Sequence, residues 1–128
     1  MSLSIHTEHS TPERATMRLH GRLDATTFGA FDEAAQSLLP GIAPGGTLVL
    51  DLAALDYISS AGLRSFAKAR KGMRERGGHT LVLDPQPQVR KVFDIVKAVP
   101  VREVFASVQE LDAYLDTIQR QVAQASED

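Results

Sequence analysis

The 128-residue sequence contains no cysteine, no asparagine and no tryptophan, and aromatic residues make up only 5% of it. The absence of cysteine excludes disulfides, thiol nucleophiles and thiolate metal sites, and the absence of asparagine excludes N-linked glycosylation. No apolar run approaches the roughly 20 residues of a membrane-spanning helix. Residues 1–5 do not have the basic and apolar regions of a signal peptide. We therefore expect a cytoplasmic protein that is not inserted into a membrane.

Neither sign of charge is in large excess, since 14 basic and 16 acidic residues leave a formal net charge of −2. The few aromatic residues are not interleaved with basic ones, so we expect no binding to nucleic acid. Hydrophobic residues make up 43% of the chain, which suffices for one packed core. We expect a single domain over residues 1–116, with residues 117–128 forming the end of the last helix and a tail.

Apolar patterns predict the strands. They cover 3–8, 17–23, Thr47–Leu50, Thr80–Leu83 and, weakly, an edge strand at 101–105. The third and fourth are continuous apolar runs, which are typical of strands buried on both faces. We expect a turn over residues 53–57, between the third strand and the helix that follows it.

Apolar residues spaced three and four apart predict about four helices. One follows Asp24, which we expect to be its N-cap; two cover 60–76 and 87–96; the last begins at a capping box formed by Ser107 and Glu110. Strands alternating with helices indicate the α/β class, with a mostly parallel mixed sheet of about five strands. In such sheets functional sites gather at the rim formed by the carboxyl ends of the strands.

The usual signatures of catalysis and cofactor binding are missing. The four histidines, at positions 6, 9, 20 and 79, share no metal-ligand spacing. The sequence has neither a glycine-rich phosphate loop nor a Gly-x-Ser-x-Gly nucleophile motif. We therefore predict no metal, no cofactor and no enzymatic activity.

Two serines, Ser59 and Ser60, stand where a strand-like apolar stretch changes to a predicted helix. Spacing alone favours capping, in which a hydroxyl accepts a hydrogen bond from a free N–H of the first turn. The alternative is a modification site, because a phosphoryl group would face free N–H groups and the positive end of the helix dipole. Phosphorylation would add a charge of about −1.5 to −2 at the rim.

The predicted helix over 60–76 is strongly basic. Six basic residues stand against Glu75, which gives the segment +5 and the rest of the chain −7. The six are Arg64, Lys68, Arg70, Lys71, Arg74 and Arg76. Cations near the C-terminal turn stabilise the helix dipole, and the same charges could also meet an acidic patch on a partner.

The segment Ile58–Arg64 reads Ile-Ser-Ser-Ala-Gly-Leu-Arg and resembles the signature of the STAS family, the sulphate-transporter and anti-sigma-factor-antagonist domain. Gly21–Asp24 resembles a second element of that family, Gly-x-Leu-Asp before the first helix, and Pro87–Phe93 resembles its third helix. The resemblance runs in the right order over residues 3–116. Ser59 departs from the pattern, because aspartate is common at its position, and this leaves two candidate acceptor serines.

The resemblance implies a bacterial signalling protein that regulates transcription, namely an anti-sigma factor antagonist. The unphosphorylated form would bind an anti-sigma factor that is also a serine kinase and so release a sigma factor. Phosphorylation of Ser60, with Ser59 as second choice, would end the binding, because unpaired charge buried at an interface is costly. A serine phosphatase would restore the first form. By position, the implied partner-binding residues are Asp24, Ser59, Ser60, Ala61, Gly62, Arg64 and Lys68, with Gly62 allowing close approach of a partner backbone.

Two other functions remain open. The chain could be the STAS subunit of a membrane transporter such as a lipid-export ABC system, although such relatives often lack the Ser59–Ser60 pair. It could also be a small-ligand-binding regulatory module. The last helix has a heptad-like apolar pattern over only two heptads, so we expect a monomer or a weak homodimer.

Overall fold

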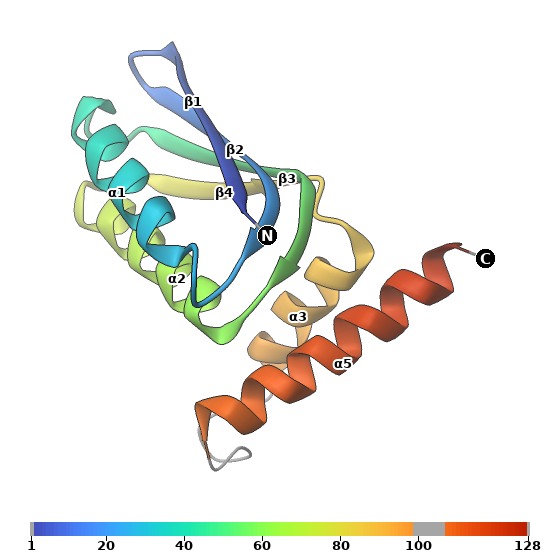
Figure 1. Cartoon of the computed structure of the whole chain (residues 1–128). Coiled ribbons are helices and arrows are strands. Elements are labelled where there is room, and N and C mark those ends of the chain that lie inside the picture. The colour runs from blue at the N-terminus through green and yellow to red at the C-terminus, as the bar shows by residue number, and fades with distance from the viewer. Residues whose placement is uncertain (1, 99–106, 128) are drawn as a thin grey trace.

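The computed structural model describes residues 2–98 and 107–127. In chain order its elements are β1 (Leu3–Thr11), β2 (Arg14–Leu23), α1 (Phe28–Leu38), the 3-10 turn η1 (Leu39–Gly41), β3 (Thr47–Ile58), α2 (Ser60–Glu75), β4 (His79–Leu83), α3 (Pro87–Ala98) and α5 (Val108–Glu127). Four strands of this described part form one sheet in the order β1-β2-β3-β4. β1 runs antiparallel to β2, and β2, β3 and β4 are parallel. The predicted α/β fold is confirmed (Figure 1), and the strand predicted at 101–105 lies outside the described residues.

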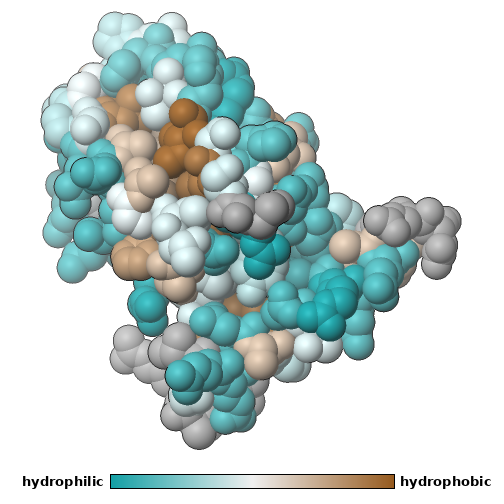
Figure 2. Space-filling model, viewed as in Figure 1, coloured by the Kyte–Doolittle hydropathy of each residue, from teal (hydrophilic) through white to brown (hydrophobic). Residues whose placement is uncertain are grey.

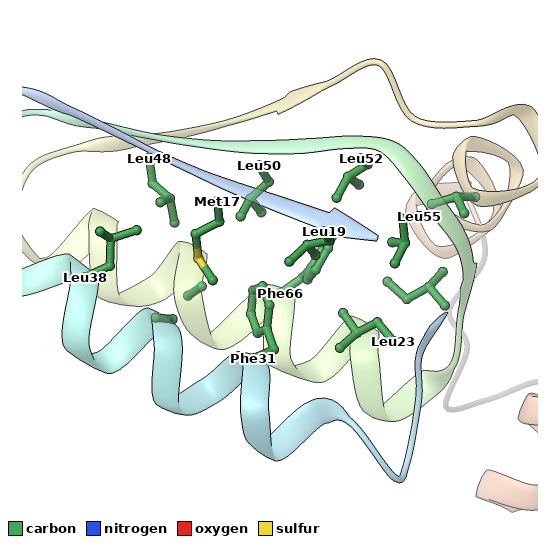
Figure 3. Close-up of a cluster of buried hydrophobic side chains, with 14 of the residues drawn as sticks. Met17, Leu19, Leu23, Phe31, Leu38, Leu48, Leu50, Leu52, Leu55 and Phe66 are labelled. Atoms are coloured by element: carbon green, nitrogen blue, oxygen red, sulfur yellow. The ribbon is translucent and has the colours of Figure 1, made fainter. Parts of the chain in front are cut away.

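The hydrophobic core lies between the sheet and the helices α1 and α2, which lie side by side (Figure 1). Figure 3 shows Met17 and Leu19 of β2 pointing toward Phe31 of α1 and Phe66 of α2. The ring centroids of Phe31 and Phe66 are 5.2 Å apart, and those of Phe66 and Phe93 of α3 are 5.6 Å apart. Such aromatic contacts add to the free energy of burial. They fix α2, and with it the segment before the helix, relative to the sheet.

Strand β3 is longer than its sequence predicts. It continues from Thr47 to Ile58 without the turn expected over residues 53–57, and that prediction is wrong. The pairing with β2 gives the reason, because β3 carries one extra residue after Asp51 and another after Leu55. Bulges of this kind bend a strand without ending it. As a result, β3 extends to the rim and ends directly before the two serines.

Strand β4 forms as predicted, but it is not buried on both faces. It is the last strand of the sheet within residues 2–98 and 107–127, and Leu81 is 57% exposed, with Val82 and Leu83 also exposed. In the apolar run of β3 burial alternates instead of being continuous, and Leu48 and Leu50 are the buried residues of that run. Figure 3 shows that α1 and α2 lie on one face of the sheet. The prediction that β3 and β4 are buried on both faces, which was based on their continuous apolar runs, is therefore wrong.

Two helix starts follow local sequence signals. Ser59 is the N-cap of α2, and its Oγ accepts a hydrogen bond from the Gly62 amide at 3.4 Å. At the start of α5, the Ser107 Oγ accepts a hydrogen bond from the Glu110 amide at 3.1 Å, which is one of the two hydrogen bonds of the predicted capping box. Both hydroxyls satisfy N–H groups that a helix leaves free in its first turn.

Candidate functional site

The carboxyl ends of β2 and β3 meet at one rim because the two strands are parallel neighbours. The Ser59 amide donates a hydrogen bond to the Leu23 carbonyl oxygen at 3.0 Å, which ties the start of α2 to the end of β2. Asp24, the residue after β2, is thereby brought to the same rim as the two serines after β3. We call the residues Ile58–Gly62 the switch segment.

The side chain and the backbone of Ser59 both stabilise the start of α2. Its side chain is buried, its Oγ accepts from Gly62, and its carbonyl oxygen accepts from the Leu63 amide at 2.9 Å. This is the geometry of an N-cap, in which the hydroxyl oxygen replaces the missing helical acceptor. The capping interpretation therefore holds for Ser59.

Ser60 is in a different situation, although it is the next residue. It is the first residue of α2 and is only 4% exposed. Its Oγ is buried and finds no hydrogen-bond partner among the described residues. Its amide donates to the Asp112 Oδ1 of α5 at 2.9 Å. A buried hydroxyl left without a hydrogen-bond partner lowers the free energy of unfolding by about 1–3 kcal/mol. The Ser60 hydroxyl therefore does not stabilise the fold.

Helix α5 covers the switch segment, a contact that the sequence did not reveal. Gln119 pairs with the backbone of Ile58: its Oε1 accepts from the Ile58 amide at 2.8 Å and its Nε2 donates to the Ile58 carbonyl oxygen at 2.9 Å. Gln119 is 3% exposed, and Leu115 beside it is fully buried. The available sequence signal is weak, since Gln119 follows Leu115 by four positions and so shares its face of the helix. Neither Asp112 nor Gln119 was predicted to belong to the site.

Ala61 and Gly62 are buried by the chain itself. A Cβ atom on Gly62 would lie 2.8 Å from the Leu23 carbonyl oxygen and 2.9 Å from the Ile58 side chain. The close approach that Gly62 allows is therefore between the start of α2 and the end of β2. The expectation that this glycine makes room for a partner backbone does not fit a position that is already filled.

Asp24 is not the N-cap of α1, as we predicted, because the helix begins at Phe28 and Thr27 takes the cap position. The Asp24 carboxylate instead accepts hydrogen bonds from the Thr26 amide at 2.9 Å and the Thr26 hydroxyl at 2.7 Å. Partial burial alone raises the pKa of this carboxyl. The hydrogen bonds from Thr26 and Thr27 and the nearby Arg22 charge outweigh burial, and the net effect lowers the pKa. Asp24 is thus an ionised group at the rim.

A second charged contact at the rim involves Tyr57. The Arg22 guanidinium lies 3.8 Å from the centre of the Tyr57 ring, and its Nε is 3.5 Å from the Asp24 carboxylate. Burial raises the pKa of the Tyr57 hydroxyl, and the Asp116 and Asp112 carboxylates of α5 raise it further. The rim around the switch segment is therefore acidic on the side where α5 packs.

The remaining predicted residues, Arg64 and Lys68, lie on the exposed side of α2. The Lys68 Nζ is 3.9 Å from the Asp32 carboxylate of α1, a distance at which an exposed pair contributes little. Both residues line a depression of about 100 Å³ together with Ala61 and the half-exposed Phe28. The basic face of α2 is thus accessible next to the switch segment.

Within residues 2–98 and 107–127 no group of three or more histidine, aspartate and glutamate side chains is placed to hold a metal ion. No helix of that part of the chain is long and apolar enough to cross a bilayer.

A model of the STAS domain family matches residues 5–111, and the chain belongs to this family. The fold agrees with the sequence resemblance, and STAS proteins of the antagonist type are regulatory binding proteins and not enzymes. In sequence, the chain is 48% identical over 48 residues to the "Putative anti-sigma factor antagonist BtrV" of Bordetella bronchiseptica. That match spans 38% of this chain and 41% of BtrV, which is less than half of either.

The solved structures with a similar fold include two forms of SpoIIAA and a mycobacterial protein. The unphosphorylated anti-sigma factor antagonist SpoIIAA is 22% identical with a TM-score of 0.60, covering 72% of this chain and 83% of SpoIIAA. The phosphorylated form of Bacillus SpoIIAA has the same identity and TM-score, covering 73% of this chain and 83% of the other. An anti-sigma factor antagonist from Mycobacterium paratuberculosis is 20% identical with a TM-score of 0.63 and covers 95% of each chain.

Proposed function

We propose that this protein is an anti-sigma factor antagonist whose partner binding is switched off by phosphorylation of Ser60. The partner is an anti-sigma factor that is also a serine kinase, a serine phosphatase reverses the modification, and the cycle takes place in the bacterial cytoplasm. The observation that supports this most is the Ser60 hydroxyl, which lies at the first position of α2 and has no structural role. The name of the BtrV relative supports the role of anti-sigma factor antagonist.

The structure favours Ser60 over Ser59 as the acceptor. Ser59 Oγ accepts the capping hydrogen bond from Gly62, so modification there would remove the N-cap and destabilise the helix start by about 1 kcal/mol. Ser60 Oγ has no bond to lose within the described residues. A phosphoryl group on Ser60 also stays close to the N-terminus of α2, where the helix dipole stabilises negative charge.

The proposed release of the partner follows from charge alone. Phosphorylation adds about −1.5 to −2 charges at a rim that already carries the ionised Asp24. A partner that binds the basic side of α2 through acidic groups would meet this new negative charge at the edge of the interface. Burying an unpaired charge costs several kcal/mol, which is enough to convert tight binding into weak binding.

The surface that we assign to the partner extends from Arg64 and Lys68 along the junction of α1 and α2. A groove of about 340 Å³ lies between these helices, lined by Lys68 and Lys71 as well as by Asp32 and Glu75. It adjoins the depression at Phe28 next to the switch segment. An acidic helix or loop of the anti-sigma factor fits the exposed Phe28 and the basic side chains of Arg64 and Lys68 next to the switch segment.

The test uses the anti-sigma factor kinase candidates encoded near the gene for this chain. Ser60→Ala should bind the partner and resist phosphorylation, whereas Ser59→Ala should still be phosphorylated. Ser60→Glu should bind about 100-fold more weakly than the matched neutral variant Ser60→Gln, measured by calorimetry on folded protein. If Ser60→Ala is phosphorylated as well as the wild type, Ser60 is not the acceptor.

A further inference from the structure

We propose that helix α5 is an autoinhibitory cover of Ser60, and that the protein alternates between a closed form, with α5 docked on the switch segment, and an open form in which Ser60 is accessible. This inference rests on the proposed phosphorylation of Ser60 and adds the regulation of that site. In the closed form the serine is shielded from the kinase, which acts on the open form.

The contacts of α5 with the switch segment are direct and specific. Asp112 binds the Ser60 amide, and Gln119, two helical turns further along, binds both backbone groups of Ile58. Leu115 lies between them on the helix and is fully buried. Figure 1 shows α5 packed along α3 on the side of the sheet where β3 ends. These three side chains place one face of α5 over Ile58 and the backbone of Ser60.

The docked helix blocks access to the hydroxyl. Transfer of the γ-phosphoryl group from ATP forms a bond to Ser60 Oγ, releases ADP and removes the hydroxyl proton, and it requires an in-line approach to that oxygen. In the closed form Ser60 is 4% exposed and its Oγ has almost no accessible surface. A kinase active site therefore cannot reach Ser60 until α5 moves.

The modified serine is also incompatible with the closed form. The Asp112 carboxylate already accepts the hydrogen bond of the Ser60 amide. A phosphoryl group at a helix start would use an N–H donor of this kind. A phosphoryl group of about −1.5 to −2 charges on Ser60 would be repelled by the Asp112 carboxylate, which lies 2.9 Å from the Ser60 amide. Phosphorylation therefore holds α5 in the open position.

The docking of α5 is weak enough to be reversible. Of the α5 side chains whose burial the structure describes, only Leu115 and Gln119 are buried, and the surface of α5 is largely hydrophilic (Figure 2). Elements with few buried apolar contacts open at a small fraction of the global free energy of unfolding. Most core residues belong to the sheet, α1 and α2, and Leu115 is the α5 residue among them, so we expect the sheet and these two helices to stay folded when α5 leaves.

The test uses the absence of cysteine from the chain, because Ser60→Cys then carries a single thiol at the covered position. Its labelling rate by a thiol reagent, corrected for the fraction of thiolate, reports how often α5 is open. We expect Ser60→Cys to react at least about tenfold more slowly than Ala67→Cys, whose thiol lies on the exposed side of the same helix. Adding Gln119→Ala should accelerate the labelling of Ser60→Cys by about tenfold.

The matched control is Gln121→Ala, the same substitution at an exposed position of α5, which should leave the rate unchanged. Circular dichroism must show that the sheet and the other helices remain folded; if Gln119→Ala fails this requirement, Asp112→Ala serves the same purpose. Equal labelling of Ser60→Cys and Ala67→Cys would overturn the proposal, as would the absence of any acceleration by both α5 substitutions. The assay needs neither kinase nor partner, so its failure leaves the phosphorylation of Ser60 standing as an independent result.

Discussion

Replacement of Gly62 by alanine tests the packing on which the position of the switch segment depends. The new Cβ atom would lie 2.8 Å from the Leu23 carbonyl oxygen, 2.9 Å from Ile58 Cγ1 and 2.9 Å from Leu23 Cγ. The nearest of these atoms belongs to the backbone, so rotation of a side chain cannot remove the contact. The same carbonyl oxygen accepts the hydrogen bond from the Ser59 amide. The start of α2 and the end of β2 must therefore move apart.

These contacts set the loss in free energy of unfolding that Gly62→Ala causes. Overpacking costs about 1–3 kcal/mol, and weakening the bond between Ser59 and Leu23 costs about 1 kcal/mol. Alanine in a helix offsets this by at most about 1 kcal/mol relative to glycine. We expect Gly62→Ala to lower the free energy of unfolding by about 1–3 kcal/mol, measured by urea denaturation.

The chain offers a matched control in Gly29 of α1, where an added Cβ atom would meet nothing within 4 Å. Gly29→Ala keeps the gain in helix propensity without a steric cost, so it should raise the free energy of unfolding by up to about 1 kcal/mol. If Gly62→Ala proves as stable as the wild type while Gly29→Ala behaves as stated, the contact with Leu23 does not constrain the rim.

The remaining predictions concern Ser59 and Tyr57. Ser59→Ala removes the N-cap of α2 and should cost about 1 kcal/mol of unfolding free energy, whereas Ser59→Thr keeps the hydroxyl and should cost clearly less; equal losses in urea denaturation would count against the capping role. The pKa of the Tyr57 hydroxyl is raised in the folded protein. The contribution of this hydroxyl to the free energy of unfolding is therefore complete below its unfolded pKa of about 10 and is lost as the pH rises through the folded pKa. The wild type should therefore lose more stability than Tyr57→Phe between about pH 9 and 11, and parallel losses in the two proteins would contradict this assignment.

Local sequence patterns were sufficient where neighbouring residues decide the structure. The cap at Ser59 and the box at Ser107 depend on hydrogen bonds within one turn, and the residues involved are visible in the sequence. The same holds for the order of strands and helices, because apolar periodicity reports which side of each element faces the core.

Patterns failed where the partner of a residue lies elsewhere in the chain. The turn expected over 53–57 is a bulged strand because pairing with β2 continues there, and pairing is not encoded in local composition. The runs Thr47–Leu50 and Thr80–Leu83 appeared buried on both faces because apolar continuity does not show whether helices cover one side of a sheet or both.

The sequence by itself determined the α/β class, the STAS resemblance and the two serines at the start of the basic helix. The tertiary structure alone decided which serine is free, since the Ser59 hydroxyl is used as the cap and that of Ser60 is not. It also decided that α5 covers the site, through contacts that Asp112 and Gln119 make across more than 50 positions of sequence. The physical reason is that a hydrogen bond depends on distance in space, and only folding brings α5 to the end of β3.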